Sequence, residues 1–113
     1  MISHVRPSDL ATWLQTAPAG ATPVVLDVRE PWELQTASVK PDGFTLVAIP
    51  MNDVPARLAE LDAGTPVACL CHHGARSLRV ANFLAHNGFD AVANLTGGID
   101  AWSAERDASV PRY

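Results

Sequence analysis

Apolar and polar positions follow two different periods along the chain. Short apolar runs rich in β-branched residues recur, and amphipathic segments with helical spacing lie between them. This alternation is typical of helices packed on a mostly parallel sheet. We therefore expect an α/β fold, with strands over residues 2–5, 23–28, 44–50, 65–71 and 91–95.

The amphipathic segments predict the helices. Residues 7–17 are expected to form the first helix, with Ser8 as its N-terminal cap. We expect the tail, residues 107–113, to be frayed because it has no periodic pattern. The other helices are predicted over residues 29–37, 52–62 and 97–106, and from Arg76 to a C-terminal cap at Gly88.

Length and charge narrow the possible functions. With 113 residues, 48% of them apolar, the chain has the size of one domain, which we place over residues 1–113. Eight basic and twelve acidic residues give a net charge of −4 and form no basic cluster, so nucleic acid is not an expected partner. We find neither a secretory leader pattern nor an apolar run of roughly 18 residues, and we expect a cytoplasmic protein without a membrane partner.

The two cysteines suggest the chemistry. Cys69 and Cys71 are separated by one strand residue, which is poor geometry for a disulfide, so a reducing compartment fits better. Cys71 ends a predicted strand, where ligand sites of parallel sheets lie, and Gly74 lets the following loop curl with its NH groups inward. Arg76 and the helix N-terminus would favour a thiolate, since comparable settings lower a cysteine pKa to about 3.5–7.5. We predict that Cys71 is a nucleophile and Cys69 a buried structural residue.

Two other interpretations concern the histidines beside Cys71. A metal site is disfavoured, because adjacent histidines on a tight loop diverge and no second cluster with ligand spacing exists elsewhere in the sequence. We therefore expect no metal. His72 or His73 could donate a proton or contact an anion, since histidine titrates near neutrality. Alternatively, both are exposed side chains whose backbone NH groups matter.

Three segments together resemble the rhodanese-like sulfurtransferases. "CHHGARS" is similar to the active-site loop of that family, "VVLDVREPWE" to its first hallmark segment and "NLTGGIDAW" to its terminal one. Their order and separation fit a single rhodanese-like domain across nearly the whole chain. The resemblance implies a five-stranded, mostly parallel sheet flanked by helices on both faces.

The resemblance also implies a reaction. Cys71 would take the outer sulfur of a donor such as thiosulfate, carry it as a persulfide and pass it to cyanide or another thiophilic acceptor. The loop would bind the substrate through His72, His73, Gly74, Ala75 and Arg76, with Arg76 attracting the anionic donor. This scheme requires no cofactor.

The family pattern assigns supporting roles to other residues. Asp27 and Arg29 would lie beneath the loop and hold it with charge-assisted hydrogen bonds, and Ser77 would support the site from within the loop motif. Trp32 either walls the pocket or covers the core. Gly97 and Gly98 are expected to form a tight turn, and Trp102 to belong to the core.

The chain departs from the family pattern after the first hallmark. Ser38 stands where a histidine is expected, and the segment "ASVKPDGFTLVAIP" is several residues longer than usual. Loops tolerate such insertions thermodynamically. The departure puts the shape of that rim in doubt, together with any partner contact there, but not the nucleophile.

Three alternative functions remain open at this stage. The first is a cysteine-dependent phosphatase. The spacing disfavours it, because such enzymes generally place five residues between cysteine and arginine, whereas only four separate Cys71 from Arg76. A sulfur-relay module with a protein donor or acceptor is a further possibility, because Glu30 and Glu33 near the expected pocket would not attract a dianionic donor. A noncatalytic interaction domain would usually lack the cysteine, which is present here.

Overall fold

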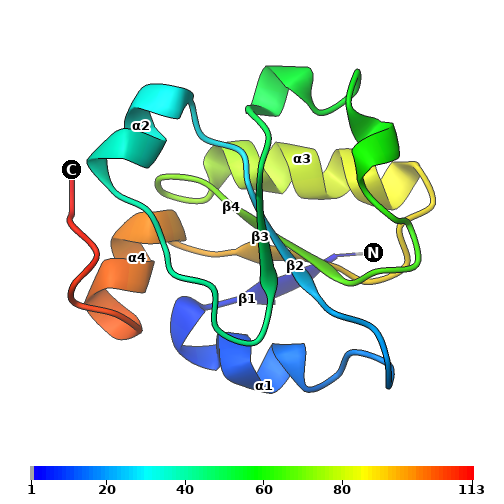
Figure 1. Ribbon diagram of the computed structural model, residues 1–113, viewed down its shortest axis with the longest axis horizontal. Helices are drawn as coiled ribbons and strands as arrows, with labels where there is room; N and C mark the ends of the chain where they lie inside the picture. Colours follow the sequence, from blue (N-terminus) through cyan, green and yellow to red (C-terminus); the bar gives the residue numbers. More distant parts are fainter. Residues whose placement is uncertain (1) are drawn as a thin grey trace.

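The five apolar runs pair into one sheet in the computed structural model, which describes residues 2–113 (Figure 1). All neighbouring strands run parallel, so the predicted α/β fold with a five-stranded sheet is confirmed. The sheet order is β1-β5-β4-β2-β3. The strands are β1 (Ser3–Val5), β2 (Val24–Asp27), β3 (Thr45–Ala48), β4 (Val67–Leu70) and β5 (Val92–Leu95).

Helices cover both faces of the sheet and divide the core in two (Figure 1). On one face, α1 (Leu10–Leu14) and α4 (Gly98–Glu105) contribute Leu10, Ile99 and the fully buried Trp102, which is a core residue as predicted. On the other face, α3 (Ala75–His86) buries Val80 and Leu84. Since burial of apolar surface stabilises both layers, the sheet is held between two apolar cores.

The strand order places the candidate residues together. β2 and β4 are neighbours, with Asp27 paired to Leu70, so the residues that follow both strands leave the sheet at the same edge. β5 lies on the other side of β4, and its Asn94 is paired with Cys69. The remaining helix, α2 (Pro31–Thr36), follows β2 directly. This edge therefore collects the segments that carried the three motifs.

The predicted helix over residues 52–62 is wrong. That segment forms two short 3-10 turns, η2 (Met51–Asp53) and η3 (Leu58–Glu60). Pro55 lies between them, and because it has no backbone NH, the Met51 carbonyl at the start of η2 cannot accept the i+4 bond of an α-helix and accepts from Val54 instead. The apolar residues have helical spacing, but residue 55 lacks the backbone NH that an α-helix beginning at Met51 would need there.

The first helix is shorter than predicted and has a different beginning. A 3-10 turn, η1 (Pro7–Asp9), precedes α1, and Ser8 does not cap the helix but donates a hydrogen bond to Glu105 instead. The α-helix ends at Leu14 rather than at residue 17. After Leu14 the backbone tightens into i→i−3 bonds, from the NH of Thr16 to Trp13 and from the NH of Ala17 to Leu14, and Pro18 then disfavours a helical conformation at Ala17. The predicted cap at Gly88 is confirmed: its φ is +88°, and the NH of Phe89 bonds to the Leu84 carbonyl.

The tail is not frayed, contrary to the prediction. Val110 is 2% exposed and belongs to the core under α1 and α4. The Ser103 hydroxyl donates to the Val110 carbonyl at 2.6 Å, and Arg112 forms an ion pair with Asp100. The tail is thus held by the buried Val110 and by polar contacts with α4, although its local composition is mostly polar. Among residues 2–113, no helix combines the length and apolar character needed to cross a bilayer.

Candidate active site

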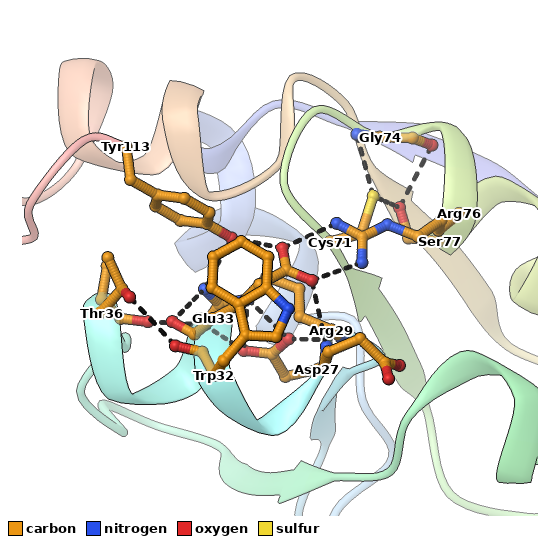
Figure 2. Close-up of polar contacts among 12 residues, drawn as sticks. Asp27, Arg29, Trp32, Glu33, Thr36, Cys71, Gly74, Arg76, Ser77 and Tyr113 are labelled. Carbon is orange, nitrogen blue, oxygen red and sulfur yellow. Dashed lines mark hydrogen bonds and ion pairs between the residues drawn. The ribbon is translucent and has the colours of Figure 1, made fainter.

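Cys71 directly follows β4 and is 1% exposed. The backbone NH of Gly74 donates to its Sγ at 3.0 Å, and the Ser77 hydroxyl lies 3.3 Å from the same sulfur (Figure 2). Cys69 lies two residues earlier inside the apolar core, where burial raises the pKa of its thiol to about 12. Both thiols are free. Cys69 is therefore inert near neutral pH, and Cys71 is the thiol with polar contacts.

Two backbone NH groups of α4 hold the loop that follows Cys71. The Ile99 NH donates to the Cys71 carbonyl at 2.8 Å, and the Asp100 NH donates to the His72 carbonyl at 3.2 Å. These NH groups lie at a helix N-terminus, where the first donors have no partner inside the helix. Because a trans peptide places its NH opposite its carbonyl, the NH groups of His72 and His73 point away from α4.

Two glycines allow this close approach. Gly74 has a φ of +111° and caps α3, so the loop turns into the helix in a conformation that favours glycine. Gly98 has a φ of +60°, and a Cβ there would lie 2.3 Å from the His72 carbonyl oxygen and 2.5 Å from that of Cys71. Gly97 is also left-handed, at +78°. The predicted tight turn is confirmed, and it brings α4 into contact with the loop.

Buried polar side chains support the loop from within. The Ser77 hydroxyl is fully buried, within 2.5 Å of Asn94 Oδ1 and 3.2 Å of the Gly74 carbonyl oxygen. Asn94 donates from its amide nitrogen to the same carbonyl at 3.3 Å. Buried polar groups are costly unless paired, so this small network ties β5 and α3 to the loop glycine. Ser77 thus has the position expected of a supporting residue.

Arg76 forms a bidentate ion pair with Glu33 of α2 (Figure 2). Its two terminal nitrogens donate to the two carboxylate oxygens at 2.6 and 2.8 Å. The hydrogen bonds from Arg76 lower the pKa of Glu33, burial opposes this, and the net result is a value of about 2. The Glu33 side chain is only 4% exposed and that of Arg76 is 32% exposed. The charge of Arg76 is therefore paired, and the negative charge of Glu33, which was not expected to attract a dianionic donor, is balanced by it.

Asp27 and Arg29 form a fully buried pair at the end of β2, with side chains 1% and 0% exposed. Arg29 donates from Nε to Asp27 Oδ1 at 2.9 Å and from Nη2 to Oδ2 at 2.7 Å. It also donates to the backbone carbonyls of Glu33 and Ala37 and to the Tyr113 hydroxyl. Burial alone would lower the pKa of Arg29, but the hydrogen bonds that it donates to Asp27 and Tyr113 outweigh burial and raise the pKa. Among the described residues, the side chains of this pair bond to the backbone of residues 29–37 and to Tyr113 rather than directly to the cysteine loop, which differs from the predicted contact.

The histidines and Trp32 differ partly from expectation. His73 is exposed, whereas His72 is half-buried, with its ring stacked on those of His73 and Tyr113 at centroid distances of 3.9 Å. Trp32 is 62% exposed and meets the Tyr113 ring edge-on, so it does not cover the core. Ala75 is exposed at the start of α3. Within residues 2–113, no group of three or more His, Cys, Asp and Glu side chains could hold a metal ion.

Sequence reasoning missed Asn94 and Tyr113, which the structure brings to this site, and it missed the partner of Glu33. Asn94 had a detectable signal, since it is a polar residue inside the apolar run "AVANL". Glu33 was recognised as nearby, but its partner on α3 was not. Tyr113 lies in a tail without periodicity, and we find no local signal for it. Each of these residues acts through contacts with residues far away in the sequence.

Substitution of Gly98 by alanine should destabilise the fold more than the same change at Gly88. Both glycines have positive φ, which costs other residues about 1–2 kcal/mol. At Gly88 an added Cβ meets nothing within 4 Å, whereas at Gly98 it overlaps two backbone carbonyls, which should add about 1–3 kcal/mol. Urea denaturation of both variants measures the difference. Equal losses in the free energy of unfolding would show that α4 does not pack closely against the loop at Gly98.

Substitution of Glu33 by glutamine should reduce stability and flatten its dependence on acidic pH. The pKa of this carboxyl falls from 4.5 to about 2 on folding, so its stabilising effect is present above pH 4.5 and is lost as pH falls toward 2. We expect a loss of about 1–3 kcal/mol at pH 7, measured by denaturation across a pH series. Glu60→Gln is the matched control, since Glu60 pairs with Arg57 at the exposed surface and should matter little. A Glu33→Gln profile parallel to that of the unmodified chain would contradict the assignment.

Comparison with known proteins agrees with this geometry. The chain is 38% identical over 91 residues to the chloroplastic rhodanese-like/PpiC domain-containing protein 12 of Arabidopsis thaliana, a match that covers 79% of this chain and 30% of that protein. It is 35% identical over 80 residues to a sulfurtransferase of Allochromatium vinosum, with 71% of each chain covered. The chain thus spans less than a third of the plant protein and most of the bacterial one.

A solved structure shows the same fold. The polysulfide-sulfur transferase homodimer of Wolinella succinogenes matches with a TM-score of 0.70 and 31% identity, over 92% of this chain and 74% of that chain. The sequence pattern of the rhodanese-like domain family matches residues 10–105, from the first helix to the end of α4. Since this match covers most of the chain and includes the cysteine loop, the chain belongs to the rhodanese-like domain family.

Proposed function

We propose that this chain is a sulfurtransferase that carries a sulfane sulfur on Cys71. The observation that supports it most directly is the Gly74 NH, which donates to the Cys71 Sγ at 3.0 Å at the carboxyl end of β4. A donor in this place would stabilise negative charge on sulfur, as the NH groups of an oxyanion hole do for oxygen. A bacterial relative that is similar over most of its length is a sulfurtransferase, which agrees with the proposal.

The proposed reaction has two steps. The Cys71 thiolate attacks the outer sulfur of thiosulfate, so a new S–S bond forms on the cysteine while the S–S bond of thiosulfate breaks and its electron pair leaves with sulfite. Cyanide or another thiophilic acceptor then attacks the terminal sulfur and releases the thiolate. This is a ping-pong scheme with a covalent intermediate. A reducing compartment such as the cytoplasm would keep the thiol free for it.

One observation favours a second candidate, in which the physiological donor or acceptor is a protein. The bidentate pair with Glu33 occupies the Arg76 guanidinium, which was the cation expected to attract a dianionic donor. Arg76 then serves to hold the loop to α2, and the recognition of thiosulfate has less electrostatic support. In this relay scheme Cys71 carries the same persulfide, but the partner's surface delivers or removes the sulfur.

Substitution of Cys71 by serine should abolish persulfide formation and leave the fold intact. We expect intact-protein mass spectrometry after incubation with thiosulfate to show a gain of one sulfur atom, which cyanide removes. Cys69→Ala is the matched control and should retain this gain, because that thiol is buried and inert. Sulfur uptake by the Cys71→Ser variant would remove Cys71 from the central role. No uptake by the unmodified chain, with a reduced thiol, would favour a protein donor.

Substitution of Arg76 by alanine should raise the KM for thiosulfate by about tenfold if its charge attracts the donor, since tenfold corresponds to about 1.4 kcal/mol. Glu33→Gln separates this role from loop support, because it weakens the same pair but leaves the cation in place. We expect steady-state kinetics to show a higher KM for Arg76→Ala only. If both variants raise KM equally, Arg76 acts through the loop rather than on the donor.

A further inference from the structure

The C-terminal segment brings an aromatic ring to the cysteine loop. Val110 anchors the segment in the core, and an exposed ion pair between Arg112 and Asp100 adds only a weak contact with α4. The chain then places Tyr113 beside α2 and the loop, as Figure 2 shows. Tyr113 is partly buried and lies against residues from two separate parts of the sequence, Arg29 and Glu33 in one and His72 in the other.

The Tyr113 hydroxyl links the two ion pairs of the site. It accepts a hydrogen bond from Arg29 Nη1 at 3.1 Å and donates one to Glu33 Oε2 at 2.6 Å. The same carboxylate oxygen accepts from Arg76 Nη2 at 2.8 Å. The hydroxyl therefore accepts one of the hydrogen bonds of the buried Arg29 guanidinium. It also fixes the Glu33 carboxylate, which in turn holds Arg76.

The Tyr113 ring orients the residue next to the nucleophile. It stacks on His72 with a centroid distance of 3.9 Å and an interplanar angle of 8°, and His73 stacks on His72 at the same distance. Two rings this close to one imidazole must occupy its opposite faces. The His72 Nε2 atom is buried without a hydrogen-bond partner within residues 2–113, so stacking rather than hydrogen bonding holds this side chain.

We propose that Tyr113 is a positioning residue for sulfur transfer, which holds the cysteine loop through His72 and through the Glu33–Arg76 pair. This inference rests on the proposed function and adds to it a residue outside the three family motifs. The ring fixes the loop at the residue after Cys71, and the hydroxyl fixes it at Arg76. Since a displacement of about 1 Å near the reacting atoms can cost about a hundredfold in rate, support at both points matters for catalysis.

Two substitutions separate the hydroxyl from the ring. Tyr113→Phe keeps the stack but removes the hydrogen bond to Glu33, and we expect sulfur transfer to fall about threefold to tenfold. Tyr113→Leu removes both, and we expect a fall of about tenfold to a hundredfold together with faster amide hydrogen exchange in residues 72–76. Arg112→Gln is the matched control: it breaks an exposed contact of the same segment and should leave the rate within about twofold.

A pH profile provides a readout that general destabilisation would not produce. Three titratable groups contact Glu33. Arg76 of α3 and the Tyr113 hydroxyl contact its carboxylate, and Arg29 contacts its backbone carbonyl. The hydrogen bond from Tyr113 helps to lower the pKa of Glu33, so its loss in Tyr113→Phe should move the acid limb of activity to higher pH. Tyr113→Leu should move it in the same direction, and Arg112→Gln should not move it.

The outcomes distinguish failure of this inference from failure of the proposed function. If the unmodified chain forms the persulfide and both Tyr113 variants match it in rate, acid limb and loop exchange, the positioning role is wrong. If the unmodified chain forms no persulfide from thiosulfate, the proposed thiosulfate reaction fails in favour of a protein donor, and hydrogen exchange still tests whether Tyr113 holds the loop. Unchanged exchange in Tyr113→Leu would overturn the inference in that case too. Thermal melting of each variant verifies that it is folded.

Discussion

The site depends on one buried cation, the guanidinium of Arg29, whose side chain is fully inaccessible to solvent. Arginine cannot shed its proton inside a protein, and its five NH groups all need acceptors once water is excluded. Here all five have one: the Asp27 carboxylate, two backbone carbonyls and the Tyr113 hydroxyl. The end of β2, the helix α2 and the C-terminal segment must therefore converge on this group.

The position of the cysteine loop follows from that convergence. Because the Arg29 guanidinium bonds to the carbonyl of Glu33 within α2 and to that of Ala37 directly after the helix, α2 presents the Glu33 side chain to Arg76 at the start of α3. From the other side, α4 donates two NH groups to the loop carbonyls, which the absence of a side chain at Gly98 permits. The loop is thus held by charge on one flank and by helix NH groups on the other. Cys71 lies between these two supports.

Local pairing, rather than net charge, decides the electrostatics near the cysteine. The chain carries a net charge of −4, and Glu33 in isolation would make the site repel anions. In the fold, Glu33 accepts hydrogen bonds from Arg76 and Tyr113, which keep it ionised and occupied. A carboxylate that is bonded in this way acts as a structural anchor. The electrostatic preference of the site is therefore set by which charges are paired.

The amino-acid sequence by itself determined the five strands, the parallel α/β class, the core role of Trp102 and the place of Cys71 at a strand end, since these follow from local periodicity and glycine positions. It misled at residues 52–62, where Pro55 breaks a helical pattern, and at the tail, whose polar composition hides the buried Val110. Only the tertiary structure decided the partners of Arg76, His72 and Tyr113. Those partners lie on elements far apart in the chain, and an ion pair or a ring stack leaves no periodic trace in the sequence.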